Sequence, residues 1–194
     1  KTVVTHGFLV DARTGDKLSK SGFLIPAEEV VAKLGADIFR LWVASINYTD
    51  DIPISWEIIA ERNDPYRKIR NTFRFLLGNT NDFNPATDAV APDNLLPIDR
   101  WAWAEMSALI GDVTDSYERF EFFKVYHRLS QFCVVELSSV YFAILKDRLY
   151  TLARNSRERR SAQTVLHRIL CGLAKMFSPI IPHTRSFWLG EVGP

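Results

Sequence analysis

The sequence predicts a mainly α-helical protein: an antiparallel helical bundle preceded by a short segment of mixed α/β character. Two observations lead to this fold class. After residue 46, apolar residues recur at steps of three and four, the spacing of helices with one buried face. Strand-forming residues gather instead near the start, at Val3, Val4 and Phe8 to Val10, before a turn-rich segment. With 47% hydrophobic residues among 194, the chain can bury a core.

Residues 1–45 predict a strand or hairpin, a polar loop and two short helices. The loop runs from Lys17 to Gly22, where small and polar residues dominate. Pro26 is expected to begin the first helix and Gly35 to end it, the positions that proline and glycine favour. Asp37 is expected to cap the second helix, which places an apolar stripe on one face.

Residues 46–194 predict the bundle. Ser55 is expected to cap a short helix, Asp64 a longer one that starts at Pro65, and Asp99 a third. A loop rich in Asn, Asp and Pro fills residues 79–97. The side chains expected on the buried helix faces are Ile69, Phe73 and Leu76 or Leu77; Trp103, Met106, Ile110, Val113 and Tyr117; Phe122, Tyr126, Leu129, Cys133, Leu137, Val140 and Ile144; and Val165, Ile169, Leu173 and Met176.

Charge and cysteine usage limit the classes of partner. The net charge is +1, from 24 basic and 23 acidic residues, so a nucleic-acid partner would have to bind a local basic patch. Cys133 and Cys171 have neither zinc nor disulfide spacing, which predicts core residues in a reducing compartment. No apolar run reaches the ~20 residues of a membrane span. We expect a cytoplasmic protein without a membrane or metal site, and we also expect it to be monomeric.

The segment Lys17-Leu18-Ser19-Lys20-Ser21 carries the first chemical signal. Two lysines three residues apart, with hydroxyl groups beside them, form a cationic loop that suits a polyphosphate. Fixed positive charge there would stabilise charge that develops on a leaving pyrophosphate. Taken alone, the pattern is more often that of a solvated surface loop.

Several motifs together resemble one family. Thr5-His6-Gly7-Phe8, followed by the loop at residues 17–21, resembles the second signature of class I aminoacyl-tRNA synthetases, usually written KMSKS. The segment from Gly35 to Trp42 is similar to their isoleucyl, valyl and leucyl branch. Residues 47–55 and 66–79 are similar to the isoleucyl-tRNA synthetases in particular. The likeness continues in the family's order through Leu96-Pro97-Ile98-Asp99-Arg100-Trp101, Lys146-Asp147-Arg148-Leu149-Tyr150, residues 159–164 and Ser178-Pro179-Ile180-Ile181-Pro182.

The resemblance implies a division of labour along the chain. Residues 1–45 would be the end of the catalytic nucleotide-binding domain and residues 46–194 the helical anticodon-binding domain. ATP, with Mg²⁺, would be bound at the loop: Lys17 and Lys20 would contact its phosphates and act in catalysis. Ser19 and Ser21 would shape the loop, and His6 and Gly7 would lie at the edge of the ATP pocket. The loop departs from the family at Leu18, a volume-conserving replacement of Met, and lacks the Leu-Gly-Asn that usually follows.

A second set of residues predicts contact with RNA. On a helical period, Arg67, Arg70 and Arg74 share a face opposite Ile69 and Phe73. Such a face is often only solvated, but in a chain that resembles a tRNA ligase it predicts contact with phosphates. The basic run from Arg154 to Arg160 is equally consistent with a tRNA contact or an exposed connection. The expected RNA-binding residues are Arg67, Lys68, Arg70, Asn71 and Arg74.

The resemblance implies that the whole enzyme joins isoleucine to tRNA(Ile) at the expense of ATP. The 194 residues lack the family's other ATP motif, a His-x-Gly-His type sequence, so we expect the chain alone to be catalytically inactive. Three alternatives remain open. They are a stand-alone helical RNA-binding module, a protein-interaction module whose basic face binds an acidic partner, and the related valyl-tRNA synthetase.

Overall fold

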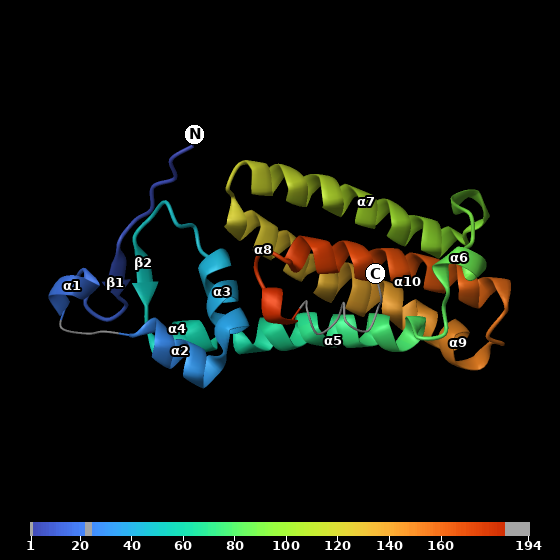
Figure 1. The fold of residues 1–194 in the computed structure, drawn as a ribbon, viewed down its shortest axis with the longest axis horizontal. Helices are drawn as coiled ribbons and strands as arrows, with labels where there is room; N and C mark the ends of the chain where they lie inside the picture. Colours follow the sequence, from blue (N-terminus) through green and yellow to red (C-terminus); the bar gives the residue numbers. More distant parts are fainter. Residues whose placement is uncertain (1, 22–24, 185–194) are drawn as a thin grey trace.

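The computed structural model describes residues 2–21 and 25–184, with the backbone only for Lys20 and Ser21. A small N-terminal unit lies at one end of a helical bundle (Figure 1), which confirms the predicted mainly α fold. The small unit contains β1 (Leu9–Asp11), α1 (Leu18–Ser21), α2 (Ala27–Leu34), α3 (Ala36–Ala44), β2 (Ile52–Ile54) and α4 (Trp56–Ala60).

The small unit is built on a parallel pair of short strands. Leu9 of β1 lies opposite Ile52 of β2, and Val10 opposite Pro53. The sequence did not predict β2, because a three-residue strand with a central proline lacks the usual strand signature. The predicted hairpin is reduced to one antiparallel bridge, between Val10 and Lys17. The loop prediction was wrong for residues 18–21, which form the single helical turn α1.

A small apolar cluster holds this unit together. It contains Ile25 and Val30 near α2, Trp42 of α3, and Ile54 and Ile59 of β2 and α4. The cluster therefore extends past residue 45, where the sequence analysis placed the boundary, and includes the segment through α4. The bundle begins after it.

The bundle consists of α5 (Asn63–Thr80), α7 (Pro97–Glu118), α10 (Arg157–Phe177) and one continuous helix, Phe122–Thr151. The four helices run in alternating directions along the long axis (Figure 1), the antiparallel arrangement that was predicted. The predicted loop between α5 and α7 contains two short helical elements, α6 (Pro85–Asp88) and a 3-10 turn (Pro92–Asn94).

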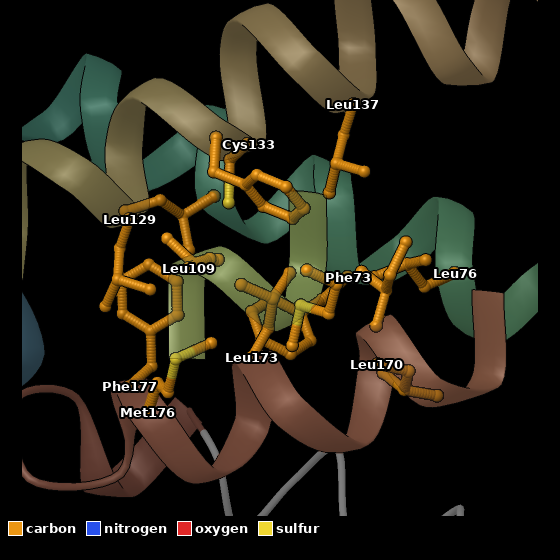
Figure 2. Close-up of a cluster of buried hydrophobic side chains, with 14 of the residues drawn as sticks. Phe73, Leu76, Leu109, Leu129, Cys133, Leu137, Leu170, Leu173, Met176 and Phe177 are labelled. Atoms are coloured by element: carbon orange, nitrogen blue, oxygen red, sulfur yellow. The ribbon is translucent and has the colours of Figure 1, made fainter. Parts of the chain in front are cut away.

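The bundle core confirms most of the predicted buried faces. Phe73 and Leu76 of α5 point toward Leu170 and Leu173 of α10 (Figure 2), and all four are at most 1% exposed. On α7, the buried line is Ala102, Met106, Leu109 and Val113. Trp103 and Tyr117 pack against its edge, and the prediction was wrong for Ile110, which is 37% exposed.

The long helix changes its register in the middle. It comprises α8 (Phe122–Gln131), a π-helical segment (Phe132–Tyr141) and α9 (Phe142–Thr151). In the π-helical segment, the Ser138 hydroxyl donates to the carbonyl of Cys133, five residues back, at 2.8 Å. The wider turn inserts extra residues into the buried stripe. After Leu137 the core therefore takes Tyr141 and Leu145, and the predicted Val140 and Ile144 are exposed.

Two of the four predicted aspartate and serine caps have long-range partners instead. Ser55 does cap α4, accepting from the Ile58 amide at 3.3 Å. Asp99 does not cap α7, which begins at Pro97; it is fully buried and accepts from the hydroxyls of Tyr141 and Ser161. Asp37 is also misassigned: α3 has Gly35 as its N-cap, and the Asp37 carboxylate binds residues after α10.

Asp64 is the other misassigned cap. It lies in the first turn of α5, whose N-cap is Arg62, and pairs with Lys68 at 2.9 Å. Two predictions about glycine and cysteine are confirmed. Gly35 ends α2 with a φ of 92°, a conformation that favours glycine. Cys133 is fully buried, as predicted, whereas Cys171, also predicted as a core residue, is only partly buried.

By length and composition, the helix Phe122–Thr151 could cross a membrane. Its regularly spaced apolar residues, such as Leu129 and Leu137, lie in the bundle core. Midway along it, Arg128 pairs with Glu136 at 3.0 Å. Both observations fit the core helix of a bundle, which is how we interpret it.

Candidate functional site

The cationic loop sits beside β1. Lys17 is exposed, and its ammonium group lies 3.8 Å from the centre of the Phe8 ring. Leu18 packs against the small apolar cluster, which anchors α1 to the unit, while Ser19 is exposed. The backbone of Lys20 and Ser21 completes α1; their side chains, and residues 22–24, lie outside the described part of the chain.

Gly7 owes its identity to a close approach of backbone. Its amide donates to the carbonyl of Tyr48 at 2.8 Å, and a Cβ at this position would stand 2.1 Å from the carbonyl oxygen of Asp50. The next amide, of Phe8, donates to the Asp51 carboxylate at 2.8 Å. His6 is exposed, and its Nδ1 lies 2.7 Å from the Gly7 carbonyl. The amides of Gly7 and Phe8 thus fasten the segment before β1 to residues 48–51.

The five predicted RNA-binding residues all lie on the exposed side of α5. Lys68 is occupied by Asp64. We call the other three cations, Arg67, Arg70 and Arg74, the α5 basic face. Within the described residues, none of their three side chains makes a hydrogen bond or ion pair. Asn71 is exposed beside them.

The α5 basic face follows directly from the packing of α5. Ile69, Phe73 and Leu76 are at most 1% exposed and face the bundle, so the arginines on the opposite arc face solvent. Gly78, on the same exposed side, has open space around it. Three guanidinium groups at steps of three and four, without acidic partners among residues 2–21 and 25–184, form a row of positive charge on one helix.

A surface depression adjoins this face. It has a volume of about 440 Å³ and lies between the turn that joins α2 to α3 and the start of α5. Arg70 and Tyr66 line it from α5. Through Arg70, the depression lies next to the α5 basic face, and it extends from there to residues 34–38 of the small unit.

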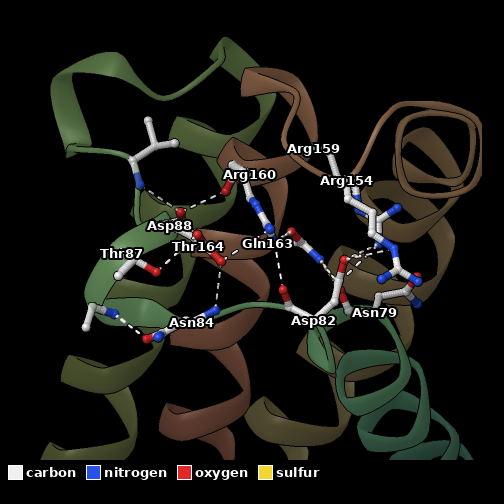
Figure 3. A network of polar contacts seen from close by, with 12 residues as sticks. Asn79, Asp82, Asn84, Thr87, Asp88, Arg154, Arg159, Arg160, Gln163 and Thr164 are labelled. Carbon is white, nitrogen blue, oxygen red and sulfur yellow. Dashed lines mark hydrogen bonds and ion pairs between the residues drawn. The ribbon is translucent and has the colours of Figure 1, made fainter.

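The second basic run, Arg154 to Arg160, is largely used inside the protein (Figure 3). Arg159 and Arg160 have 16% exposed side chains. Arg159 pairs with Asp82 at 3.0 Å, and Arg160 pairs with Asp88 at 3.3 Å. Both acids lie in the connection after α5, so these arginines hold that connection against α10. Of the two explanations left open, a structural role is favoured for Arg159 and Arg160.

A polar contact that was not predicted from the sequence joins the small unit to the bundle. Arg40 of α3 donates from Nε to the carbonyl of Ile180 at 2.9 Å and from Nη2 to that of Pro179 at 2.6 Å. Its partners are some 140 residues away in sequence, so no local pattern indicates the contact. The only signal was the presence of Arg40 inside the motif from Gly35 to Trp42.

Two family models match the chain at the two parts of the fold. The model described as tRNA synthetases class I (I, L, M and V) matches residues 1–55. The model described as the anticodon-binding domain of tRNA ligase matches residues 99–186. The first match covers the loop and both strands, and the second covers most of the bundle.

Curated relatives match almost the whole chain. The isoleucine–tRNA ligase of Symbiobacterium thermophilum is 52% identical over 185 residues, 95% of this chain and 20% of the relative. Those of Thermotoga maritima and Persephonella marina are 50% and 49% identical, over 95% and 99% of this chain. The chain thus spans about a fifth of the length of these relatives.

A solved structure shares the fold. It is a LeuRS of Agrobacterium radiobacter K84, in a ternary complex with tRNA and LeuAMS; the TM-score is 0.73 at 22% identity, over 97% of this chain and 22% of that one. At this identity the match shows the arrangement of the two parts. The chain belongs to the class I aminoacyl-tRNA synthetase family, and its 194 residues correspond to a segment of that family's isoleucine–tRNA ligases.

Proposed function

We propose that this chain is the part of an isoleucine–tRNA ligase that holds tRNA on its bundle and presents an ATP-phosphate loop from its small unit. The observation that carries the proposal is the α5 basic face: Arg67, Arg70 and Arg74 are exposed and make no ion pair with the described residues. Cations without internal partners release counterions when they bind phosphates, which is the main source of affinity for nucleic acids.

We use 'full-length protein' for a protein that contains this chain and has the length of the relatives named above. In that protein, isoleucine would attack the α-phosphate of ATP. The products would be an adenylate and pyrophosphate. A hydroxyl of the terminal ribose of tRNA(Ile) would then attack the acyl carbon of the adenylate, forming the ester and releasing AMP. Lys17 and Lys20 would stabilise charge on the phosphates as the pyrophosphate leaves. Ser19 and Ser21 would shape the loop, and His6 and Gly7 would lie at the edge of the ATP pocket.

Magnesium would accompany the phosphates. In the ranges that the structure describes, no three His, Cys, Asp or Glu side chains gather as a metal site. Mg²⁺ commonly binds through substrate phosphates and water rather than through an all-protein cage. We therefore expect Mg²⁺ to enter the site bound to ATP. We also expect the enzyme to be cytoplasmic.

The relatives named above, at about 50% identity, are isoleucine rather than valine ligases, so the valyl alternative is not favoured. The anticodon-binding family match, over residues 99–186, and the tRNA in the LeuRS complex support RNA over an acidic protein as the partner of the bundle.

Fluorescence anisotropy tests whether the bundle recognises the anticodon. Full-length protein is titrated with isoleucine tRNA and with the same tRNA carrying a changed anticodon. We expect tighter binding to the unaltered tRNA and a steep loss of affinity in salt. Equal affinity for both would contradict an anticodon-reading bundle and leave a grip on phosphates alone.

The loop assignment has its own test. Lys20→Ala in the full-length protein is expected to slow isoleucine-dependent ATP–pyrophosphate exchange about 100-fold or more, because one fixed charge at the transition state is lost. Affinity for tRNA should stay within about twofold, since the α5 basic face is untouched. Unchanged exchange would show that the motif is misassigned.

A further inference from the structure

Arg40 binds the chain just beyond α10 with two nitrogens of its guanidinium group, Nε and Nη2. The accepting carbonyls, of Pro179 and Ile180, belong to consecutive residues and lie 2.6 and 2.9 Å from the nitrogens. A guanidinium presents several donors in one rigid plane, whereas a lysine ammonium is a point charge on a flexible stem. The pair of bonds therefore fixes both the position and the angle of α3 against this segment.

Asp37, one turn earlier on α3, binds the same segment a few residues further on. Its carboxylate accepts from the amides of His183 at 3.3 Å and Thr184 at 2.6 Å, and from the Thr184 hydroxyl. Residues 182–184 are helical, so these are amides of a first helical turn, which lack partners within their own helix. Asp37 thus caps a helical turn some 146 residues away, and is only 7% exposed.

The hydroxyl of Thr184 also joins this contact to α5. It lies 2.9 Å from the hydroxyl of Tyr66, one residue before Arg67 of the α5 basic face. We call Asp37, Arg40 and residues 178–184 the α3 joint. The joint connects the small unit, the end of α10 and the start of α5.

Helix α3 takes part in both hydrophobic clusters. Trp42 packs in the small unit, while Leu41 and Ala44 pack in the bundle core. Apolar contacts are not directional and allow helices to slide over small distances. Charge-assisted hydrogen bonds have a defined geometry. The polar joint therefore selects one orientation of α3, and with it one position of the loop unit.

We propose that Asp37 and Arg40 are positioning residues that set the loop-bearing small unit relative to the tRNA-holding bundle. This inference rests on the proposed function. The joint contains none of the residues assigned to ATP phosphates, and none of its hydrogen bonds among the described residues involves the arginines of the α5 basic face. Its role lies in the step that needs both parts at once, the transfer of the acyl group to tRNA.

The test compares three activities of the full-length protein. Arg40→Ala is expected to keep ATP–pyrophosphate exchange without tRNA and the Kd for tRNA within about twofold of wild type. The kcat for charging tRNA should fall about tenfold or more, because a misplacement of about 1 Å can cost a large factor in rate. Arg40→Lys, which keeps the charge but loses the planar fork, should lie between the two.

A role in stability alone predicts a different pattern. Exchange, binding and charging would then fall together, in step with a lower Tm, and that result would overturn the proposal. Unchanged charging by Arg40→Ala would overturn it as well. Arg119→Ala, which removes an exposed arginine at the end of α7, is the matched control and should leave all three activities unchanged.

The proposed function and the joint fail in distinguishable ways. A wild-type protein that neither activates isoleucine nor charges tRNA would refute the function, and the joint would fall with it. A wild-type protein that does both, beside an Arg40→Ala variant that charges tRNA normally, would refute the joint alone. Asp37→Asn, which keeps the size of the side chain but removes its charge, provides the second variant and is expected to act in the same direction as Arg40→Ala.

Discussion

The guanidinium of Arg159 donates from Nη2 to both carboxylate oxygens of Asp82, at 3.2 and 3.0 Å. Gln163 donates to the same carboxylate at 2.6 Å, and Arg160 donates to the Asp82 main-chain carbonyl at 3.0 Å (Figure 3). This network lies at the end of the bundle away from the small unit (Figure 1). Arg159 and Arg160 belong to a basic run that could have bound RNA, but in this network they hold the connection after α5 against α10.

Asp82 makes the free energy of unfolding depend on pH. Burial opposes its ionisation, but the hydrogen bond from Gln163 and the charges of Arg159 and Arg160 outweigh this, so the pKa of Asp82 lies below its ordinary value of 3.8. A lowered pKa in the folded state stabilises the protein above the unfolded pKa. That contribution is lost as the pH falls through the lower, folded pKa.

The variant Asp82→Asn should therefore be less stable than wild type by about 1–3 kcal/mol at pH 7. The difference should shrink as the pH is lowered below about 4. Urea unfolding of both proteins at pH 7 and pH 3 measures it. Asp93→Asn, at an exposed position, is the control and should have little effect. A difference that stays constant with pH would contradict the assignment.

The register of the π-helical segment predicts opposite outcomes at two neighbouring positions. Leu145 is fully buried and Ile144 is 47% exposed. Leu145→Ala should cost about 2–5 kcal/mol of unfolding free energy, and Ile144→Ala about 0.5 kcal/mol or less. Denaturant unfolding of the two variants decides the matter. Equal costs, or a larger cost at Ile144, would mean that the helix keeps a regular α-helical register.

Gly7 predicts a contrast between two glycines. A Cβ at Gly7 would meet the Asp50 carbonyl oxygen at 2.1 Å, whereas Gly111, exposed on α7, has nothing within 4 Å. Gly7→Ala should move the strand that precedes the loop away from residues 48–51 and lower stability. Gly111→Ala should raise stability by up to about 1 kcal/mol, because alanine favours a helix. Thermal unfolding of both variants gives the two signs, and a Gly7→Ala protein as stable as wild type would contradict the close approach.

We expect the 194-residue chain by itself to have no catalytic activity. Isoleucine-dependent ATP–pyrophosphate exchange by these 194 residues alone should not exceed background, because the family's other ATP motif is not among them. Exchange clearly above background would show that the loop unit suffices for activation. The full-length protein is the positive control.

The sequence predicted best where side-chain spacing alone decides burial. Helix α10 is a regular helix, so Val165, Ile169, Leu173 and Met176 are buried as predicted. The same reasoning failed after Leu137, because a 3.6-residue period cannot anticipate a π-helical turn. The serine hydroxyls of Ser138 and Ser139, which bond to carbonyls five residues back, are a signal visible only in the structure.

Polar residues were harder to place, because local rules compete with distant partners. Asp37 and Asp99 were predicted as caps from their positions before apolar stripes. In the fold, each aspartate accepts hydrogen bonds from residues far away in sequence. Asp37 accepts from His183, 146 residues away, and Asp99 accepts from Ser161, 62 residues away. The α5 basic face was predictable because exposure follows from the opposite, buried face. The α3 joint was not, since its two sides come together only in the tertiary structure.

The central claim is that the α5 basic face binds the phosphates of tRNA. Its most direct test is the salt dependence of tRNA binding by full-length protein, compared with the triple variant Arg67→Gln, Arg70→Gln, Arg74→Gln. Arg119→Gln, which makes the same kind of change at one exposed arginine outside the α5 basic face, is the control. Each arginine that contacts a phosphate should remove about one from the slope of log K against log salt. We predict a slope shallower by about three in the triple variant and unchanged in the control. An identical slope in all three proteins would contradict the account.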